Sequence, residues 1–522
     1  MSGRTLSTDG VITLSGKAIV ISIDKQGERP QRLLGVRTSD GQRVLVQPAD
    51  PAQAAGLHSG MQLELTGHFM QQQQQQQGAV TAAAAAGTSG TVRQFAAASL
   101  RAWGARTAVP RQAAVSDGSV VSSAAGVAKT TTVKSSNQLV AKEVSTLFIP
   151  IAAMKGGKAC PGTALPKYTN AEIQQAVFQE VNPSAVTVGS TYNKCSYGAS
   201  KLTMNNSAVA PLVELPCSGT NNGVSWSFSQ CNFDDYNGYS DAADAWLRKR
   251  GVNIDAYNHK VYLVPSGACA FVGLGYVGCD GSFECRSWIG ADFWTTPAAM
   301  AHELGHNLFM GHAGAMSAGS FDEYADMSGM MGYCCSDRCF NTPHAWQMGW
   351  ISVQQLDGTS LKPGHTLTTN ISSQSLSYRS GLRIVPDWAP GTAPVFLGFR
   401  TKAGGDSSFT DLARKLHIYS ANITNSFDPQ VTTWETELGT AGASWAHPTA
   451  RLVVRLRSIA PGAATVSVCR KAGAETLASC RAGLDNDCNG LVGERDPVCA
   501  RLLERAAGAV KRPPPARRMP KQ

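Results

Sequence analysis

Three histidines and a glutamate stand close together in the chain, at His302, Glu303, His306 and His312. His302 and His306 are four residues apart, so on a helix they share one face and can hold one metal ion. His312 is six residues further on and reaches that ion only if the helix ends between them. Three neutral imidazoles that leave a fourth position open for water form the ligand set of a catalytic zinc site.

Glu303 directly follows the first histidine, which turns its carboxylate towards the open position. Zinc polarises a scissile carbonyl and lowers the pKa of its water towards 7. Glu303 would accept that water's proton as general base and later deliver it to the leaving amine. A helix with surface His and Glu residues shows the same four-residue spacing, so the interpretation needs further signals.

A methionine-containing turn follows the third histidine, in the run Asp-Met-Ser-Gly-Met-Met-Gly-Tyr at 326–333. A methionine in such a turn resembles the metzincin zinc proteases, in which its side chain forms an apolar floor beneath the metal ligands. We expect Met331 to be that floor, with Met330 as the competitor and an ordinary core methionine as the alternative. Tyr333 is a candidate to stabilise a transition-state oxyanion, against the alternative of a structural tyrosine.

The resemblance narrows to one family, the gametolysin family of secreted zinc endopeptidases. It rests on residues 302–313, on the methionine turn, and on segments 338–350, 271–279 and 285–289. It covers residues 146–357 well and the later part of the chain loosely. The resemblance implies His302, His306 and His312 as zinc ligands, Glu303 as the base, and substrates among extracellular-matrix or cell-wall glycoproteins.

One residue departs from the metzincin pattern. Glycine usually stands three residues after the second histidine, where the helix ends and the chain reverses, but this chain has Phe309 there. Either the turn moves to Gly311, or Phe309 adopts a left-handed conformation at a cost of about 1–2 kcal/mol. The departure puts the angle of His312 in question.

Helices and strands must position these residues. The segment from Thr296 to about Phe309 predicts the metal-binding helix, with Pro297 in its first turn, where a missing N–H costs nothing. Upstream patterns predict strands at 147–151, 261–265 and 271–277, a helix capped by Asn170, and a second helix at 240–248. We therefore expect an α+β fold, a twisted sheet packed on helices, with a metzincin-like catalytic domain over residues 146–357.

Other regions flank this domain. Strand patterns at 11–14, 18–23, 43–46 and 62–65 predict a small β module over residues 1–70, a candidate prosegment. Residues 71–145 are Gln-, Ala-, Gly- and Ser-rich and read as a low-complexity linker. Short strands such as 382–385, 395–399 and 452–456 predict an antiparallel β domain over 358–470. A Cys-rich segment (471–500) and a basic, Pro-rich tail (501–522) follow.

The cysteines indicate the compartment. All 14 lie at or after Cys160, and their even number outside any CxxC zinc pattern favours disulfides and an extracellular protein. No signal peptide is visible in Met1–Thr5, so we expect that the N-terminus is incomplete. No apolar stretch of about 18 residues predicts a transmembrane helix. The net charge of +9 comes without a basic stripe interleaved with aromatics, which argues against nucleic acid as a partner.

A second metal site is a candidate near the C-terminus. Asp485, Asp487 and Asn489 occupy positions one, three and five of a twelve-residue loop, with Leu491 at seven and Asp496 at twelve. This order follows the oxygen-ligand logic of a calcium loop. No convincing helices flank it, and the alternative is an Asp/Asn-rich loop tied down by cysteines.

The sequence thus predicts a zinc endopeptidase. The rival interpretation is a catalytically weak or inactive matrix-binding or calcium-dependent adhesion protein on a protease scaffold. Some secreted proteases are kept inactive by a prosegment cysteine bound to the zinc, but no cysteine precedes Cys160 here. If the N-terminal residues are an inhibitory prosegment, we therefore expect them to block the site sterically or to bind the zinc through a different side chain. Cleavage in the linker would then activate the enzyme.

Overall fold

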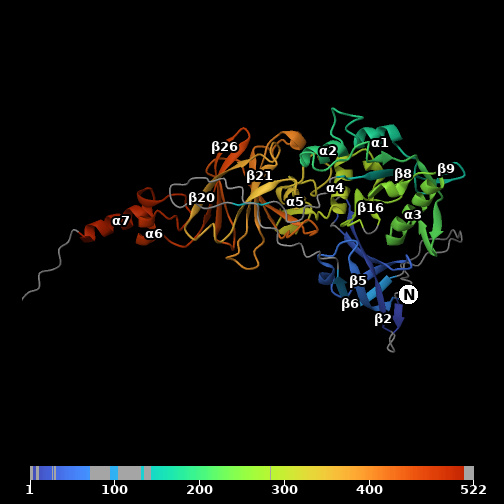
Figure 1. Cartoon of the computed structure of the whole chain (residues 1–522), viewed down its shortest axis with the longest axis horizontal. Helices are drawn as coiled ribbons and strands as arrows, with labels where there is room; N and C mark the ends of the chain where they lie inside the picture. Colours follow the sequence, from blue (N-terminus) through green and yellow to red (C-terminus); the bar gives the residue numbers. More distant parts are fainter. Residues whose placement is uncertain are drawn as a thin grey trace, which may run out of the picture.

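The computed structural model describes residues 4–6, 11–25, 28, 31–70, 94–103, 131–133, 143–281 and 284–510. Its fold is α+β, as expected (Figure 1). Residues 143–357, here called the central region, carry helix α4 (Pro297–Asn307), which contains His302, Glu303 and His306. A small barrel lies below the central region in this view, two β-sheets lie beside it, and a pair of helices forms the far end. Within the described residues, no helix is long and apolar enough to cross a membrane.

Five N-terminal strands close into the barrel. They are β2 (Ile12–Asp24), β3 (Gln31–Arg37), β4 (Arg43–Pro48), β5 (Gln62–Phe69) and β6 (Gln94–Trp103). Their order is β2–β3–β4–β6–β5, and β5 pairs back onto β2. The short strand β1 (Arg4–Leu6) pairs with the start of β2. Alternate residues such as Leu14, Val36, Leu65 and Phe95 fill the interior.

Two expectations for this region were wrong. The strands expected at 11–14 and 18–23 are one strand, because a side chain on Gly16 would overlap the Arg37 carbonyl and its absence lets β2 continue close to β3. The linker expected over 71–145 is interrupted by β6, whose Phe95 and Ala97 are buried in the barrel. Its Ala-rich composition hid the strand, since alanine has low β-propensity. The polyglutamine run lies outside the described residues.

A sheet continuous with the barrel forms the core of the central region. Its strands are β10 (Ala208–Val209), β8 (Thr146–Lys155), β14 (His259–Leu263), β16 (Cys285–Ile289) and β15 (Gly273–Tyr276), in that order. β8, β14 and β16 run parallel, and β15 is antiparallel to β16. Short strands β9 (Lys158–Ala159) and β11 (Val213–Leu215) also pair with β8, and β12 (Ser218–Asn221) pairs with β13 (Val224–Ser227). These parallel strands are buried on both faces, and β8 accordingly has a long apolar stretch, whereas β14 and β16 each carry buried polar residues near their start.

Helices cover both faces of this sheet. α1 (Asn170–Val177), α2 (Val188–Cys195) and α4 pack on one face, and α3 (Phe233–Lys249) packs on the other. The cap of α1 is Thr169, not Asn170 as predicted, because the Thr169 hydroxyl accepts the Glu172 N–H and the Glu172 carboxylate accepts the Thr169 N–H. α3 begins well before the predicted residue 240, at a box closed by Asn232 and Asp235.

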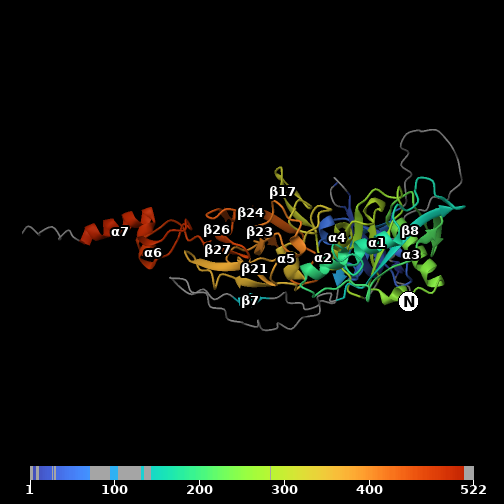
Figure 2. The same cartoon turned by 90° about the horizontal axis from the view of Figure 1, so that it is seen from above.

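Two sheets make up the C-terminal β region (Figure 2). The larger sheet has the order β18 (Ser320–Asp322), β17 (Ala313–Ser317), β24 (Thr432–Leu438), β23 (Lys415–Ala421), β22 (Val395–Arg400), β21 (Arg379–Ile384), β19 (Ser352–Leu356) and β7 (Thr131–Val133). The smaller sheet has the order β20 (Thr366–Ser372), β27 (Ala463–Arg470), β26 (Leu452–Ala460) and β25 (Ser444–Ala446). Their facing apolar residues form one core.

The boundary expected at residue 357 is not a structural boundary. β17, β18 and β19 come from the central region and extend the larger C-terminal sheet, and helix α5 (Thr342–Gln347) packs on it. β17 pairs with β24, and β19 pairs with β21, in parallel, so the sheet is mixed rather than purely antiparallel. Parallel pairing joins segments far apart in sequence, which local strand patterns do not reveal.

Seven disulfides pair all fourteen cysteines, in line with the oxidising framework expected from the sequence. Cys195–Cys339 ties α2 to the segment after the methionine turn. Cys469–Cys488 and Cys480–Cys499 hold the Cys-rich segment, in which α6 (Leu477–Ala482) and α7 (Pro497–Val510) were not predicted. The expected tail therefore begins as helix, and residues 511–522 lie outside the described part of the chain.

Candidate active site

Helix α4 carries His302, Glu303 and His306, and each of these residues is exposed by 4% or less. The helix ends at Asn307, and Phe309 has a φ of 68°, so Phe309 bears the left-handed turn and Gly311 does not. This reversal brings His312 back to the two helical histidines. The ring centroids of His306 and His312 are 4.7 Å apart.

The side chain of Phe309 is buried between two distant parts of the chain. Its ring meets His58 of the barrel and Phe427 of the C-terminal β region, each edge-on with centroids 4.9 Å apart. The Gln347 side-chain amide donates to the Phe309 carbonyl at 2.9 Å. Burial and these ring contacts offset the cost of the left-handed backbone.

Hydrogen-bond acceptors fix the three imidazoles from behind. His302 Nδ1 lies 3.0 Å from the Met330 carbonyl, and His306 Nδ1 lies 2.9 Å from the Met310 carbonyl. His312 Nδ1 lies 2.7 Å from Glu323 Oε1. Each acceptor calls for a proton on Nδ1, which leaves the Nε2 lone pair for a metal.

The Nε2 atoms converge as a metal site requires. His306 Nε2 and His312 Nε2 are 3.0 Å apart, a separation at which two lone pairs repel unless a cation or a proton lies between them. Burial lowers the pKa of His306 to about 4, which keeps it neutral. Burial also opposes a charge on His312, but the carboxylates of Asp24 and Glu323 outweigh it and raise the pKa of His312 to about 9. The cluster therefore favours a positive charge at its centre, and its nitrogen donors suit zinc.

Glu303 lies against strand β15. A side chain on Gly273 would overlap the Glu303 carboxylate, so the missing side chain makes room for it. Glu303 is 1% exposed, and burial, reinforced by the nearby Asp24 carboxylate, raises its pKa well above the usual value. A buried carboxylate with a raised pKa has the proton affinity of a general base.

The methionine turn lies beneath the helix. A side chain on Gly305 would overlap the Met331 sulfur, so Met331 fills the space under the turn of α4 between the two helical histidines. Met330 is also buried, and its carbonyl faces His302. Asp326 accepts from Ser328 N–H at 2.8 Å and from the Asn341 side-chain amide at 2.9 Å, which closes the turn.

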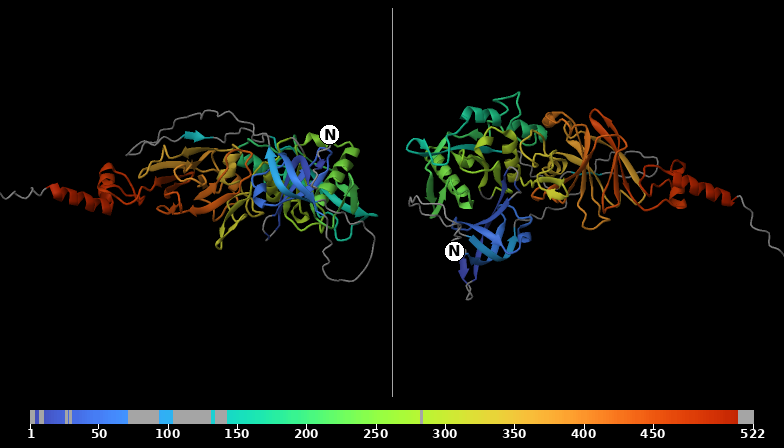
Figure 3. Two further views of the ribbon diagram at one scale, coloured as in Figure 1. Left: turned by 90° about the horizontal axis from the view of Figure 1, so that it is seen from below. Right: turned by 180° about the vertical axis from the view of Figure 1, so that it is seen from behind.

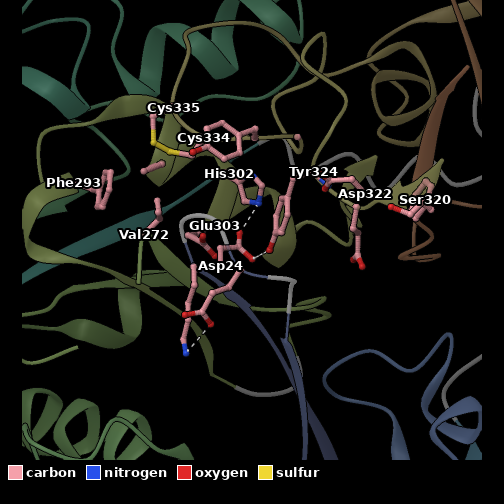
Figure 4. Close-up of a pocket in the computed structure, with 17 residues that line it drawn as sticks. Asp24, Val272, Phe293, His302, Glu303, Ser320, Asp322, Tyr324, Cys334 and Cys335 are labelled. Atoms are coloured by element: carbon pink, nitrogen blue, oxygen red, sulfur yellow. Dashed lines mark hydrogen bonds and ion pairs between the residues drawn. A yellow bond between two sulfur atoms is a disulfide. The ribbon is translucent and has the colours of Figure 1, made fainter. Parts of the chain in front are cut away.

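A pocket of about 490 Å³ opens beside His302 and Glu303 (Figure 4). Val272, Phe293 and the Cys334–Cys335 disulfide form an apolar part of its wall. Tyr333 lines the pocket and is 41% exposed. Tyr324 lies closer to the histidines, with its ring 4.4 Å from that of His312.

Three residues at the site escaped the sequence analysis, namely Asp24, Glu323 and Tyr324. Asp24 ends strand β2 of the barrel, and its carboxylate lies within 3.1 Å of His302 Nε2 and His312 Nε2. The Tyr324 hydroxyl donates to Asp24 Oδ1 at 2.6 Å. Glu323 and Tyr324 stand in an acidic run between the third histidine and the methionine turn, a signal that could have been read. No pattern in the sequence around Asp24 indicates that it lies at the site.

The predicted calcium loop lies between α6 and α7, so the expectation that no helices flank it was wrong. Oxygens of Asp485 and Asp487 meet those of Glu475, a residue not predicted, within 4.8 Å of one another. Asp496 instead caps α7, accepting the N–H groups of Val498 and Cys499 at 2.6 and 2.9 Å. Asn489 donates to Asp496 at 2.5 Å, and Leu491 donates its N–H to Asn489 at 2.8 Å.

Comparison with known proteins identifies the family of this chain. The model of the family described as gametolysin peptidase M11 matches residues 156–447. The chain is 24% identical over 297 residues to the autolysin of Chlamydomonas reinhardtii, and the alignment covers 46% of this chain and 44% of the autolysin. The similarity thus spans less than half of that relative's length. No solved structure matches. Over half of its length, with the histidine cluster inside the match, this chain belongs to the gametolysin peptidase M11 family.

Proposed function

We propose that the protein is a zinc-dependent endopeptidase with His302, His306 and His312 as metal ligands and Glu303 as general base. The observation that carries the proposal is the convergence of three buried Nε2 atoms whose Nδ1 atoms are already engaged. Zinc, when bound, supplies a Lewis acid and acidifies water at neutral pH.

Residues of the chain transfer the proton, support the helix and bind the substrate. Glu303 accepts the proton of the attacking water and passes it to the leaving amine. Met331 supports the helix between the two helical histidines. The pocket beside Glu303 accepts one side chain of the substrate against its apolar wall. Tyr333 and Tyr324 both border this space, and either hydroxyl is a candidate donor to a developing oxyanion.

The substrate class rests on resemblance. We propose proteins or glycoproteins of an extracellular matrix or cell wall as substrates, and the extracellular space as the location. The name autolysin, given to the matching Chlamydomonas reinhardtii protein, fits such a role. The seven disulfides favour an oxidising compartment. The rival, a matrix-binding protein without activity, has no use for a base held beside three metal ligands.

Zinc content and casein cleavage test the proposal, for the full chain and for a fragment that begins at residue 143. Glu303→Ala is expected to retain zinc and to lose about 10²-fold or more of the activity, because it removes the base alone. His306→Ala is expected to lose both. A fragment that binds zinc, folds and cleaves nothing would contradict the proposal.

Calcium is a second candidate ligand, at the carboxylates of Glu475, Asp485 and Asp487. The favouring observation is that Asp485 Oδ1 is buried without a hydrogen-bond partner. Burial, together with the neighbouring Asp487 carboxylate, raises the pKa of Asp485. Terbium luminescence titrated with calcium tests the site, and loss of the signal in Asp485→Asn, with Asp411→Asn unchanged, is the expected result.

A further inference from the structure

Asp24, at the end of barrel strand β2, points its carboxylate towards His302 and the Tyr324 hydroxyl (Figure 4). Asp24 Oδ2 is 2.8 Å from His302 Nε2 and 3.7 Å from His306 Nε2, and Oδ1 is 3.1 Å from His312 Nε2. His302 Nε2 makes no aligned hydrogen bond despite this short distance. The four donor atoms lie within 4.8 Å of one another, close enough to hold one metal ion.

The number of protein ligands decides whether a zinc site has room for a catalytic water. Zinc sites with four protein ligands are closed and structural, whereas catalytic sites have three and keep one position for water. His302, His306 and His312 are the open set, and Asp24 completes the closed one. The Tyr324 hydroxyl and Ser22 Oγ, at 2.6 and 3.3 Å from Asp24 Oδ1, hold the carboxylate in this position.

The end of β2 also covers the strand next to Glu303. β2 pairs antiparallel with β15, with Ile21 opposite Tyr276 and Asp24 opposite Gly273. The Val272 and Val277 N–H groups donate to the Asp24 and Val20 carbonyls at 2.9 and 2.8 Å. The other edge of β15 is taken by β16. β2 therefore fills the edge on which an extended peptide could be added as a strand.

The packing around β2 shows that this placement is specific. Ile19, Ile21 and Ile23 are buried in one core cluster with Tyr276 and Trp288 of the central region. Arg43 of the barrel pairs with Asp241 at 2.6 Å and with Glu284 at 2.7 Å. Seen from behind, the barrel lies against the central region (Figure 3, right).

We propose that the N-terminal barrel is a built-in inhibitor of the active site. Asp24 acts as the fourth ligand of the metal, and residues 21–24 take the place of substrate along β15. Displacement of the barrel opens both at once. The proposal rests on the proposed zinc site.

Cobalt substitution of the full chain tests the ligand directly. In the wild type, the visible spectrum is expected to stay unchanged when a small hydroxamate is added, because no coordination position is free. Asp24→Asn is expected to change the spectrum and to bind the hydroxamate at least about tenfold more tightly, since no charged ligand must be displaced. Glu64→Gln, on β5 of the same barrel, is the matched control and is expected to behave as wild type.

An Asp24→Asn protein with the wild-type spectrum and hydroxamate affinity would overturn the proposal. X-ray absorption of the unsubstituted zinc protein provides a test that needs no variant, with three imidazoles and one carboxylate as the expected shell and a water in place of the carboxylate as the contrary result. If Asp24→Asn changes the spectrum as expected, but the zinc-bound fragment that begins at residue 143 and lacks β2 cleaves no peptide, the endopeptidase proposal fails and the Asp24 ligand stands.

Discussion

The two β regions that flank the central region are attached to it in different ways. The C-terminal sheet takes strands from the central region and reaches the site through buried polar contacts. Arg400 and Asp406, both fully buried, form an ion pair at 2.5 Å, and Arg400 donates to the Ser328 carbonyl of the methionine turn at 3.1 Å. The Thr432 N–H donates to the His312 carbonyl at 3.0 Å.

The barrel is joined differently. One strand continues into the central sheet, and the charged contacts of Arg43 with α3 are less deeply buried than the Arg400–Asp406 pair, with the side chains of Arg43 and Asp241 exposed by 14% and 25%. The barrel has a core cluster to which the central region contributes Val277. The comparison shows that the C-terminal sheet is part of the framework that holds His312 and the methionine turn, whereas the barrel has most of its core to itself and lies over the three histidines.

The largest effect is expected from breaking the buried pair on the C-terminal side. Asp406→Ala leaves the Arg400 charge buried without its partner, which is expected to cost about 3–5 kcal/mol of unfolding free energy. Urea denaturation of the full chain measures the change. Asp411→Ala, at an exposed position of the same region, is the control. A loss under about 1 kcal/mol would remove the basis for calling this sheet a framework.

A smaller effect, on zinc affinity, is expected from changing the hydrogen-bond partner of His312. Glu323 follows β18 and fixes His312 Nδ1 at 2.7 Å. Glu323→Gln is expected to weaken zinc binding about 10–100-fold, measured by competition with a chelator, because the imidazole loses its charged partner. Glu435→Gln on β24 is the control. Equal zinc affinities for the two variants would show that the orientation of His312 does not depend on Glu323.

Phe309 joins the two sides, so its replacement tests their coupling. Phe309→Ala and Phe309→Gly both remove the ring from His58 and Phe427. The glycine variant is expected to be more stable than the alanine variant by about 1–2 kcal/mol, since only glycine is unstrained at a φ of 68°. Thermal unfolding of the pair isolates the backbone strain. The reverse order would mean that the left-handed turn is not retained.

The smallest effect is expected at the barrel contact. Arg43→Ala removes the pairs with Asp241 and Glu284 and is expected to cost about 1 kcal/mol or less, because these side chains are partly hydrated. The same urea experiment measures it, with Arg101→Ala on β6 as control. A loss as large as that of Asp406→Ala would erase the difference between the two regions.

The sequence predicted features that depend on residues close together in the chain and missed those that depend on contacts between distant residues. His302, Glu303 and His306 share one helix, and spacing alone placed them together. The turn at Phe309 left two outcomes open, because the cost of a left-handed residue depends on partners as distant as His58 and Phe427. Asp24 is far from the histidines in the chain, and its role depends on the pairing of β2 with β15. Strands β17 and β19 were missed as parts of the C-terminal sheet because parallel pairing has no local signal.

The position of Asp24 at the very end of β2 has a kinetic consequence. Strand ends open locally at far lower free energy than a whole domain unfolds. Four residue pairs, from Ile21 to Asp24, join this end of β2 to β15, whereas β3 pairs with β2 only as far as Ile23 and β5 pairs with its first half. Leakage of activity from the covered form would therefore follow fraying of one strand tip, which amide exchange at Val272 and Val277 reports residue by residue.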